Sequence, residues 1–184
     1  LKSTDSASTA TAFATGNKVH NGEISSKNHI DLPILTDFIK SLGYGVGLVT
    51  TDYLYTETVA AFSSHVDSKD NIDEIVSDQI MSNVDLFLGK SSSEYVNNKI
   101  NFANQGYTFI DNFSNLKLSK SKIIGAFEEI IEEQTLTDSV TLDKLTDFAV
   151  DYMETNFSNG YLLIVECGHI DRMAHNSLIF EMIQ

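Results

Sequence analysis

Short apolar runs alternate along the chain with longer segments in which apolar residues recur every three or four positions. The short runs have the length and composition of buried strands; they are YGVGLVT at 44–50, DLFLG at 85–89, YTFID at 107–111 and YLLIVE at 161–166. The longer segments have helical spacing; they begin near residues 6, 33, 51, 72, 97 and 141. Strands separated by helices of this length are typical of parallel β-α-β crossovers. The pattern therefore predicts the α/β class, with a mostly parallel sheet covered by helices on both faces.

The first helical segment, STDSASTATAFATG at 3–16, is rich in small residues. Such a run could be a flexible linker, or a helix that packs closely on the sheet. Gly16 can end a helix that begins near Ser6, and Phe13 together with the alanines favours a buried helix. The free N–H groups and dipole of a helix start would then face the Ser6 hydroxyl, which stabilises an alkoxide-like oxygen and attracts phosphate. Asp5, directly before it, can cap the helix or orient a cation.

Composition and charge narrow the possible partners. The 184 residues are 42% hydrophobic, which suits one globular domain spanning residues 1–184. The formal net charge of −14 disfavours nucleic acid and anionic membranes and suits a protein that holds divalent cations. Cys167 is the single cysteine, so no disulfide can form within the chain. No apolar run approaches the roughly 20 residues of a membrane span.

The two ends of the sequence suggest a piece of a longer protein. The chain opens on Leu1 instead of Met and stops at Gln184 within a helical pattern. We therefore expect a domain truncated at both ends, with an export signal upstream of Leu1.

Ligands of parallel α/β sheets bind at the carboxyl ends of the strands, so the residues after YLLIV are leading candidates for a site. Glu166 ends this strand and offers a hard oxygen suited to Mg²⁺. Asp171 and His175 are four residues apart and would share one face of a helix. A carboxylate and an imidazole at this spacing can bind one zinc ion. They can also form a plain helix-face hydrogen bond or ion pair, which the spacing alone favours over a metal site.

A second group of candidates follows the strand GLVT. Thr56, Glu57 and Thr58 precede an apolar helical segment, where threonine can simply cap the helix. Lys69, further along, has the pattern of an ordinary solvated lysine. Spacing alone gives none of these four residues a chemical role.

Three motifs together resemble the alkaline phosphatase family. TDSASTATAFATG is similar to the family's nucleophile segment, GLVTTDYLYTETVAAFSSHV to its next signature, and NGYLLIVECGHIDRMAH to its Glu-x-x-x-x-Asp-x-x-x-His segment. They occur in the family's order and at family-like separations. The resemblance implies a large parallel α/β sheet, of which residues 1–184 are a truncated catalytic domain, and a homodimeric enzyme.

The resemblance implies that Ser6 is the nucleophile that becomes phosphorylated, activated by zinc, with Asp5 in a supporting role. The family's phosphate-clamping arginine falls at Lys69, which supplies charge but not a planar two-pronged grip. Thr56 stands where many relatives carry Asp or His, a difference that can alter the outer shell of the metal. Glu57 is an additional carboxylate to which the sequence assigns no role.

The metals implied by the resemblance are two Zn²⁺ and one Mg²⁺. Thr58 and Glu166 are expected to hold the Mg²⁺, and Asp171 with His175 to bind one zinc ion. The family's first metal-binding Asp is expected before residue 1, and its Asp-His pair and last zinc-binding His after residue 184. The second zinc would then have almost no protein ligands in this chain, so we expect the isolated fragment to be inactive.

The activity implied by the resemblance is hydrolysis of small-molecule phosphate monoesters through a phosphoserine, in a periplasmic or extracellular enzyme. Two alternatives remain open. A phosphodiesterase or sulfatase of the same superfamily would differ in the residues that clamp the non-bridging oxygens, and Lys69 leaves room for that difference. A non-catalytic phosphate- or metal-binding relative would lack the ligands expected beyond both ends.

Overall fold

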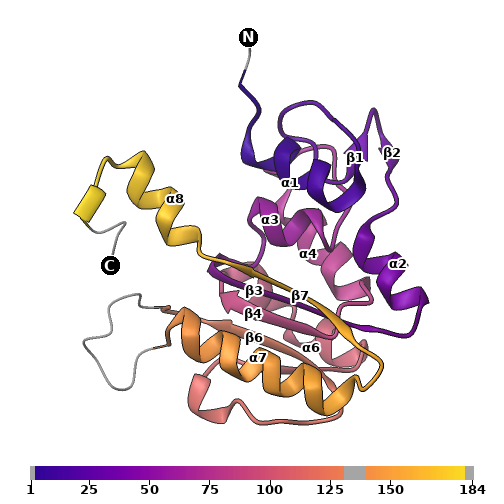
Figure 1. The fold of residues 1–184 in the computed structure, drawn as a ribbon, viewed down its shortest axis with the longest axis vertical. Helices are drawn as coiled ribbons and strands as arrows, with labels where there is room; N and C mark the ends of the chain where they lie inside the picture. The colour runs from indigo at the N-terminus through magenta and orange to yellow at the C-terminus, as the bar shows by residue number, and fades with distance from the viewer. Residues whose placement is uncertain (1–2, 131–139, 181–184) are drawn as a thin grey trace.

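The computed structural model describes residues 3–130 and 140–180, in which a five-stranded sheet lies between two layers of helices (Figure 1). The strand order is β5-β6-β4-β3-β7, and every neighbouring pair is parallel. The strands are β3 (Gly45–Tyr53), β4 (Leu86–Lys90), β5 (Tyr107–Ile110), β6 (Lys122–Phe127) and β7 (Tyr161–Glu166). The predicted α/β class and parallel sheet are therefore confirmed.

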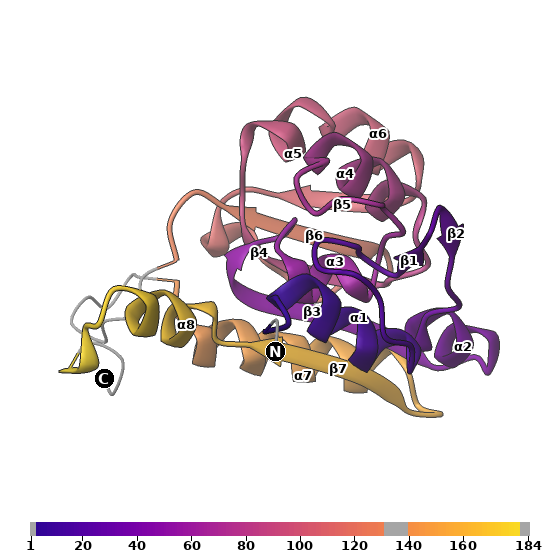
Figure 2. The same cartoon turned by 90° about the horizontal axis from the view of Figure 1, so that it is seen from above.

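Helices cover both faces of this sheet, as predicted (Figure 2). One face packs against α7 (Leu142–Asn156), and its core includes Leu86 and Leu88 of β4. The other core contains Phe87, because successive side chains of a strand point to opposite faces. The helices on this second side are α1 (Ser6–Thr15), α2 (Leu35–Ser41), α3 (Glu57–Ala61), α4 (Ile72–Met81), α5 (Ser93–Asn97) and α6 (Lys99–Asn104).

Three smaller elements complete the described chain. A short antiparallel pair, β1 (Ser26–Lys27) with β2 (Ile30–Asp31), follows α1. A 3-10 turn, η1 (Phe113–Asn115), precedes β6, and α8 (Gly168–His175) follows β7. No helix within residues 3–130 and 140–180 has the length and apolar character needed to cross a bilayer.

The sequence pattern did not predict β6. Its segment KIIGAF, which contains Gly125, follows β5 with only the 3-10 turn η1 (Phe113–Asn115) between them, so it lacks the helical pattern that separates the other strands. The structure gives the glycine a packing role, because a Cβ at this position would lie 2.7 Å from the Leu88 side chain. Gly125 therefore permits the close contact between β6 and β4.

The prediction that α1 packs directly on the sheet is wrong, because α1 packs mainly on another helix. Its buried face, which includes Ala7, Ala10 and Ala14, lies mainly against α3, and α3 in turn contacts β3. Phe13 was expected to be buried, yet it is 76% exposed. Small residues allow a close approach to whichever element is adjacent, and the sequence does not say which element that is.

The arrangement of β3 and β7 brings the candidate residues to one edge of the sheet. Thr50 of β3 is the register partner of Glu166, the last residue of β7. The chain leaves β3 toward α3 and leaves β7 toward α8, so both groups of candidates follow the carboxyl ends of adjacent strands.

Candidate active site

Ser6 is the first residue of α1, and its side chain is exposed. Asp5 caps the helix, because its Oδ1 accepts a 2.9 Å hydrogen bond from the backbone N–H of Ser8. Gly16 ends the helix with a positive φ of 72°, a conformation that favours glycine. The predicted helix from Ser6 to Gly16 is confirmed, and the linker interpretation is wrong.

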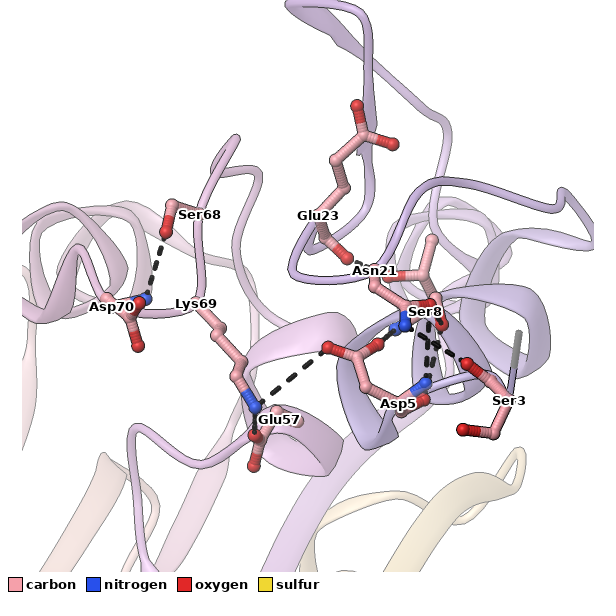
Figure 3. A network of polar contacts seen from close by, with 10 residues as sticks. Ser3, Asp5, Ser8, Asn21, Glu23, Glu57, Ser68, Lys69 and Asp70 are labelled. Atoms are coloured by element: carbon pink, nitrogen blue, oxygen red, sulfur yellow. Dashed lines mark hydrogen bonds and ion pairs between the residues drawn. The ribbon is translucent and has the colours of Figure 1, made fainter.

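Asn21 fixes the start of this helix. Its Oδ1 accepts hydrogen bonds from the backbone N–H of Asp5 at 3.3 Å and from the Ser8 hydroxyl at 3.2 Å. Its Nδ2 donates to the carbonyl of Ser3 at 3.1 Å (Figure 3). Sequence reasoning missed Asn21 because it lies in the loop after the helix and meets these partners only in the folded chain.

Lys69 lies close to the residue that precedes Ser6. Its Nζ donates a 2.7 Å hydrogen bond to Oε1 of Glu57 and lies 3.9 Å from Oδ2 of Asp5 (Figure 3). Glu57 is the first residue of α3. Lys69 is therefore partly exposed and ion-paired, and its charge is held near the start of α1.

These contacts shift the pKa of both Lys69 and Asp5. The hydrogen bond to Glu57 raises the pKa of the Lys69 ammonium, against the opposing effect of partial burial. Partial burial acts to raise the pKa of the Asp5 carboxyl, but hydrogen bonds from Ser8 and the charge of Lys69 together bring it below its ordinary value. Lys69 and Asp5 are therefore both charged at neutral pH.

A groove of about 450 Å³ opens beside Ser6. Thr58 of α3 and Ile164 of β7 line it together with Ser6 of α1. The fold thus places Ser6 and Thr58 on the same cavity, although they belong to separate motifs. The Thr56 side chain, which could have capped α3, instead donates a 2.7 Å hydrogen bond to the carbonyl of Tyr53.

Glu166 is oriented by the neighbouring strand. The hydroxyl of Thr50 donates a 2.7 Å hydrogen bond to Oε2 of Glu166. Thr50 is buried, and its hydroxyl also accepts a 3.0 Å hydrogen bond from the backbone N–H of Asp52. Sequence reasoning had no signal for Thr50, because its hydrogen bond to Glu166 depends on β3 and β7 being adjacent.

Asp171 and His175 share one face of α8, as their spacing predicted. Nε2 of His175 lies 3.6 Å from Oδ2 of Asp171, and the two side chains are 80% and 67% exposed. The helix-face pair is thus present. In the part of the chain that the structure describes, no three His, Cys, Asp or Glu side chains form a metal-binding group. Zinc binding by this pair stays a prediction.

The start of α8 is held against β3. Oδ1 of Asp52 accepts a 3.1 Å hydrogen bond from Nη1 of Arg172. Gly168 lies so close to Asp52 that an added Cβ would be 2.8 Å from the Asp52 Cβ. The helix that carries Asp171 is therefore fixed to the strand that leads toward Thr58.

The site places an exposed serine at a helix start, with a lysine close to the residue before it. In an α/β protein with polar side chains at the carboxyl ends of its parallel strands, this arrangement is suited to binding an anion such as phosphate. The sequence pattern of the family described as Alkaline phosphatase matches residues 2–101. The chain belongs to the alkaline phosphatase family.

Individual relatives agree with this assignment. Alkaline phosphatase 4 of Bacillus subtilis is 31% identical over 192 residues, which cover 95% of this chain and 41% of that protein. The crystal structure of a cold-active alkaline phosphatase from the psychrophile Shewanella sp. is 32% identical, with a TM-score of 0.84, and the match covers 95% of this chain and 45% of that one. Alkaline phosphatase from the Antarctic bacterium TAB5 shares the fold at 22% identity, with a TM-score of 0.83 over 98% of this chain and 56% of that one. The chain spans about two-fifths of the length of the curated relatives.

The family resemblance and the fold that it implied are thus confirmed. The chemical roles expected of individual residues stay predictions; these residues are Asp5, Ser6, Thr58, Lys69, Glu166, Asp171 and His175.

Proposed function

We propose that the whole protein hydrolyses phosphate monoesters through a phosphoserine formed at Ser6. The observation that carries the proposal is the position of Ser6 at the N-terminus of α1, with Lys69 3.9 Å from the preceding Asp5. The N–H groups of the first helical turn and the Lys69 ammonium supply positive charge for a phosphoryl group. Membership of the alkaline phosphatase family supports the same chemistry.

Two displacements at phosphorus make up the proposed reaction. In the first, Ser6 Oγ attacks phosphorus, the bond from phosphorus to the ester oxygen breaks, and the alcohol leaves with the proton. In the second, water attacks the phosphoserine, the bond from phosphorus to Oγ breaks, and Ser6 regains a proton as inorganic phosphate forms. Lys69 neutralises charge on the non-bridging oxygens in both steps. Asp5 supports Ser6 by capping the helix that positions it.

Two zinc ions and one magnesium ion are proposed cofactors. Thr58 and Glu166 would hold the magnesium, and the oxygen donors of both side chains suit that ion. Asp171 and His175 would contribute to one zinc site and Ser6 to the other. The oxygen and nitrogen donors of the α8 pair lie 3.6 Å apart on an exposed face, which fits zinc. When bound, the cations supply positive charge that stabilises the Ser6 alkoxide and the charge developing at phosphorus. A variant of the TAB5 phosphatase was solved with magnesium bound, which supports the choice of that ion.

We further propose that the substrates are small molecules and that the whole protein is a periplasmic or extracellular homodimer. The support for location and assembly is family membership alone. For substrate size, a streptomycin-6-phosphate phosphatase from Streptomyces griseus is 42% identical over 65 residues, which cover 34% of this chain and 14% of that protein.

The test of the proposed function compares three esters of one aryl alcohol: the phosphate monoester, the phosphate diester and the sulfate. We expect the whole protein to hydrolyse the monoester fastest. Faster turnover of the diester or the sulfate would instead identify a phosphodiesterase or a sulfatase. Phosphate binding without turnover of any of the three would identify a non-catalytic relative.

A further inference from the structure

Glu57 brings a carboxylate to the side of the site where phosphate is proposed to bind. Its Oε1 lies 2.7 Å from Nζ of Lys69, and both side chains are partly exposed. We propose that Glu57 is a positioning residue that holds the Lys69 ammonium toward the start of α1 and weakens the binding of inorganic phosphate. This inference rests on the proposed function, since it concerns how the product leaves the same site.

The anchoring part of the proposal follows from the chemistry of lysine. A lysine side chain is long and flexible and lacks the rigid fork with which arginine aligns itself on a phosphoryl group. The structure fixes Lys69 at both ends: its backbone N–H donates a 2.8 Å hydrogen bond to the carbonyl of Gly22, and its ammonium donates to Glu57. An ammonium has three donors. Glu57 accepts from one of them, and the ammonium nitrogen lies 3.9 Å from Asp5 Oδ2, beyond hydrogen-bond distance, so the lysine can stay anchored to Glu57 while it contacts a phosphoryl oxygen.

The charges around Lys69 account for the weaker binding of inorganic phosphate. Asp5 and Glu57 place two negative charges around one ammonium, so these three side chains carry a net charge of −1. A phosphate dianion is therefore attracted less than it would be by the lysine alone. Partial exposure screens the effect but does not remove it. Weak product binding favours release after each turnover.

A simpler role for Glu57 would be to stabilise α3. Glu57 is the first residue of that helix, where a carboxylate interacts favourably with the helix dipole. This role would not depend on Lys69. The two roles therefore differ in whether the effect of substituting Glu57 persists when Lys69 is removed.

The experiment compares Glu57→Gln with Glu57→Ala in the whole protein, because both remove the charge and only glutamine keeps an oxygen that can accept from Lys69. Calorimetry measures the dissociation constant of inorganic phosphate, and steady-state kinetics give kcat and KM for a monoester. Glu57→Gln should lower the phosphate dissociation constant and KM about fivefold, because the lysine stays anchored and its charge is less offset. Glu57→Ala should bind phosphate no more tightly than wild type and should have kcat/KM about tenfold below the glutamine variant.

The same two substitutions in a Lys69→Ala background show whether Glu57 acts through the lysine. There they should behave alike, because no ammonium remains to be held. A persistent tenfold difference without Lys69 would overturn the proposal in favour of the helix-stabilising role. Equal behaviour of the two variants with Lys69 present would overturn the anchoring.

Asp111→Asn is the matched control. It removes the negative charge from another 2.7 Å lysine–carboxylate pair, with Lys99, directly after β5, and so changes the net charge by the same amount. It should leave phosphate binding and kinetics at wild-type values. If the wild-type protein hydrolyses no monoester, the proposed function fails. The phosphate dissociation constants of the Gln and Ala variants then still decide the role of Glu57: a difference supports it and equality overturns it.

Discussion

The Thr50 hydroxyl donates a 2.7 Å hydrogen bond to the Glu166 carboxylate, and the two residues are register partners on adjacent strands. One is a buried polar side chain of β3, and the other ends β7 at the edge of the sheet where magnesium is proposed to bind. Hydrogen bonds of this kind orient a metal-binding carboxylate, and their loss typically lowers metal affinity by about 10- to 100-fold. The hydrogen bond therefore predicts that loss of the Thr50 hydroxyl weakens magnesium binding.

Thr50→Val, which keeps the shape of the side chain and removes its hydroxyl, should weaken magnesium binding by at least about tenfold. Calorimetric titration of the metal-free whole protein measures the change. Thr36→Val is the control, because it removes a buried 2.7 Å hydrogen bond to the Phe62 carbonyl in another part of the fold. Both variants should lose about 1 kcal/mol of unfolding free energy. An equal fall in magnesium affinity in both variants would mean that the loss comes from general destabilisation and not from a changed orientation of Glu166.

Ser6→Ala should abolish the phosphoserine while the fold is retained, because the Asp5 cap uses the backbone N–H of Ser8 and not the Ser6 hydroxyl. Acid quench of the whole protein with labelled phosphate, followed by peptide mapping, measures the intermediate. Ser8→Ala is the matched control, since it removes a hydroxyl in the same helix but keeps the backbone N–H that donates to Asp5 Oδ1. Label recovered on Ser3 or Ser8 while Ser6 is unmodified would contradict the assignment.

Lys69→Ala should mainly raise KM for a monoester, with a smaller loss in kcat, because it removes the positive charge beside the start of α1. Lys69→Arg should be tolerated and should tighten phosphate binding, since a guanidinium can contact two phosphoryl oxygens at once. Steady-state kinetics and phosphate titration of the whole protein measure both effects. Unchanged kcat and KM in Lys69→Ala would mean that another residue binds the phosphoryl oxygens.

His175→Ala should release zinc from the whole protein and reduce its activity, because it removes the nitrogen donor of the α8 pair. Elemental analysis of the purified variant gives the zinc content. His20→Ala is the control, since it removes an exposed histidine in the segment between α1 and β1. Zinc content equal to that of wild type would leave the Asp171–His175 pair as a plain helix-face ion pair.

Asp85→Asn should destabilise the protein by about 2 kcal/mol or more. The buried Asp85 carboxylate accepts two hydrogen bonds from the Lys40 ammonium, at 2.7 and 2.8 Å, and one of 2.9 Å from the backbone N–H of Val46. Urea denaturation measures the change. Asp111→Asn should cost far less, because its pair with Lys99 is exposed and exposed ion pairs contribute little. Similar losses in both variants would contradict this account.

The sequence by itself determined features that depend on neighbouring residues. Short continuous apolar runs predicted strands buried on both faces of a parallel sheet, and helical spacing predicted the helices between them, because a helix buries only one face. The helix from Ser6 to Gly16 was predictable because a cap and a positive φ are local requirements of the backbone. Asp171 and His175 share a face because four residues make about one helical turn. The strand β6 escaped prediction because only the 3-10 turn η1 separates it from β5, so the helical pattern that marks the other crossovers is missing.

Only the tertiary structure decided which distant residues meet. Lys69 reaches Glu57 and Asp5 because the segment after α3 folds back beside the start of α1. Thr50 meets Glu166 because β7 pairs with β3 and not with another strand. Strand order and the choice of packing partner arise from the summed burial of the whole chain, and no local pattern encodes them. The sequence could therefore name the side chains with suitable chemistry, while the fold decided which of them lie together.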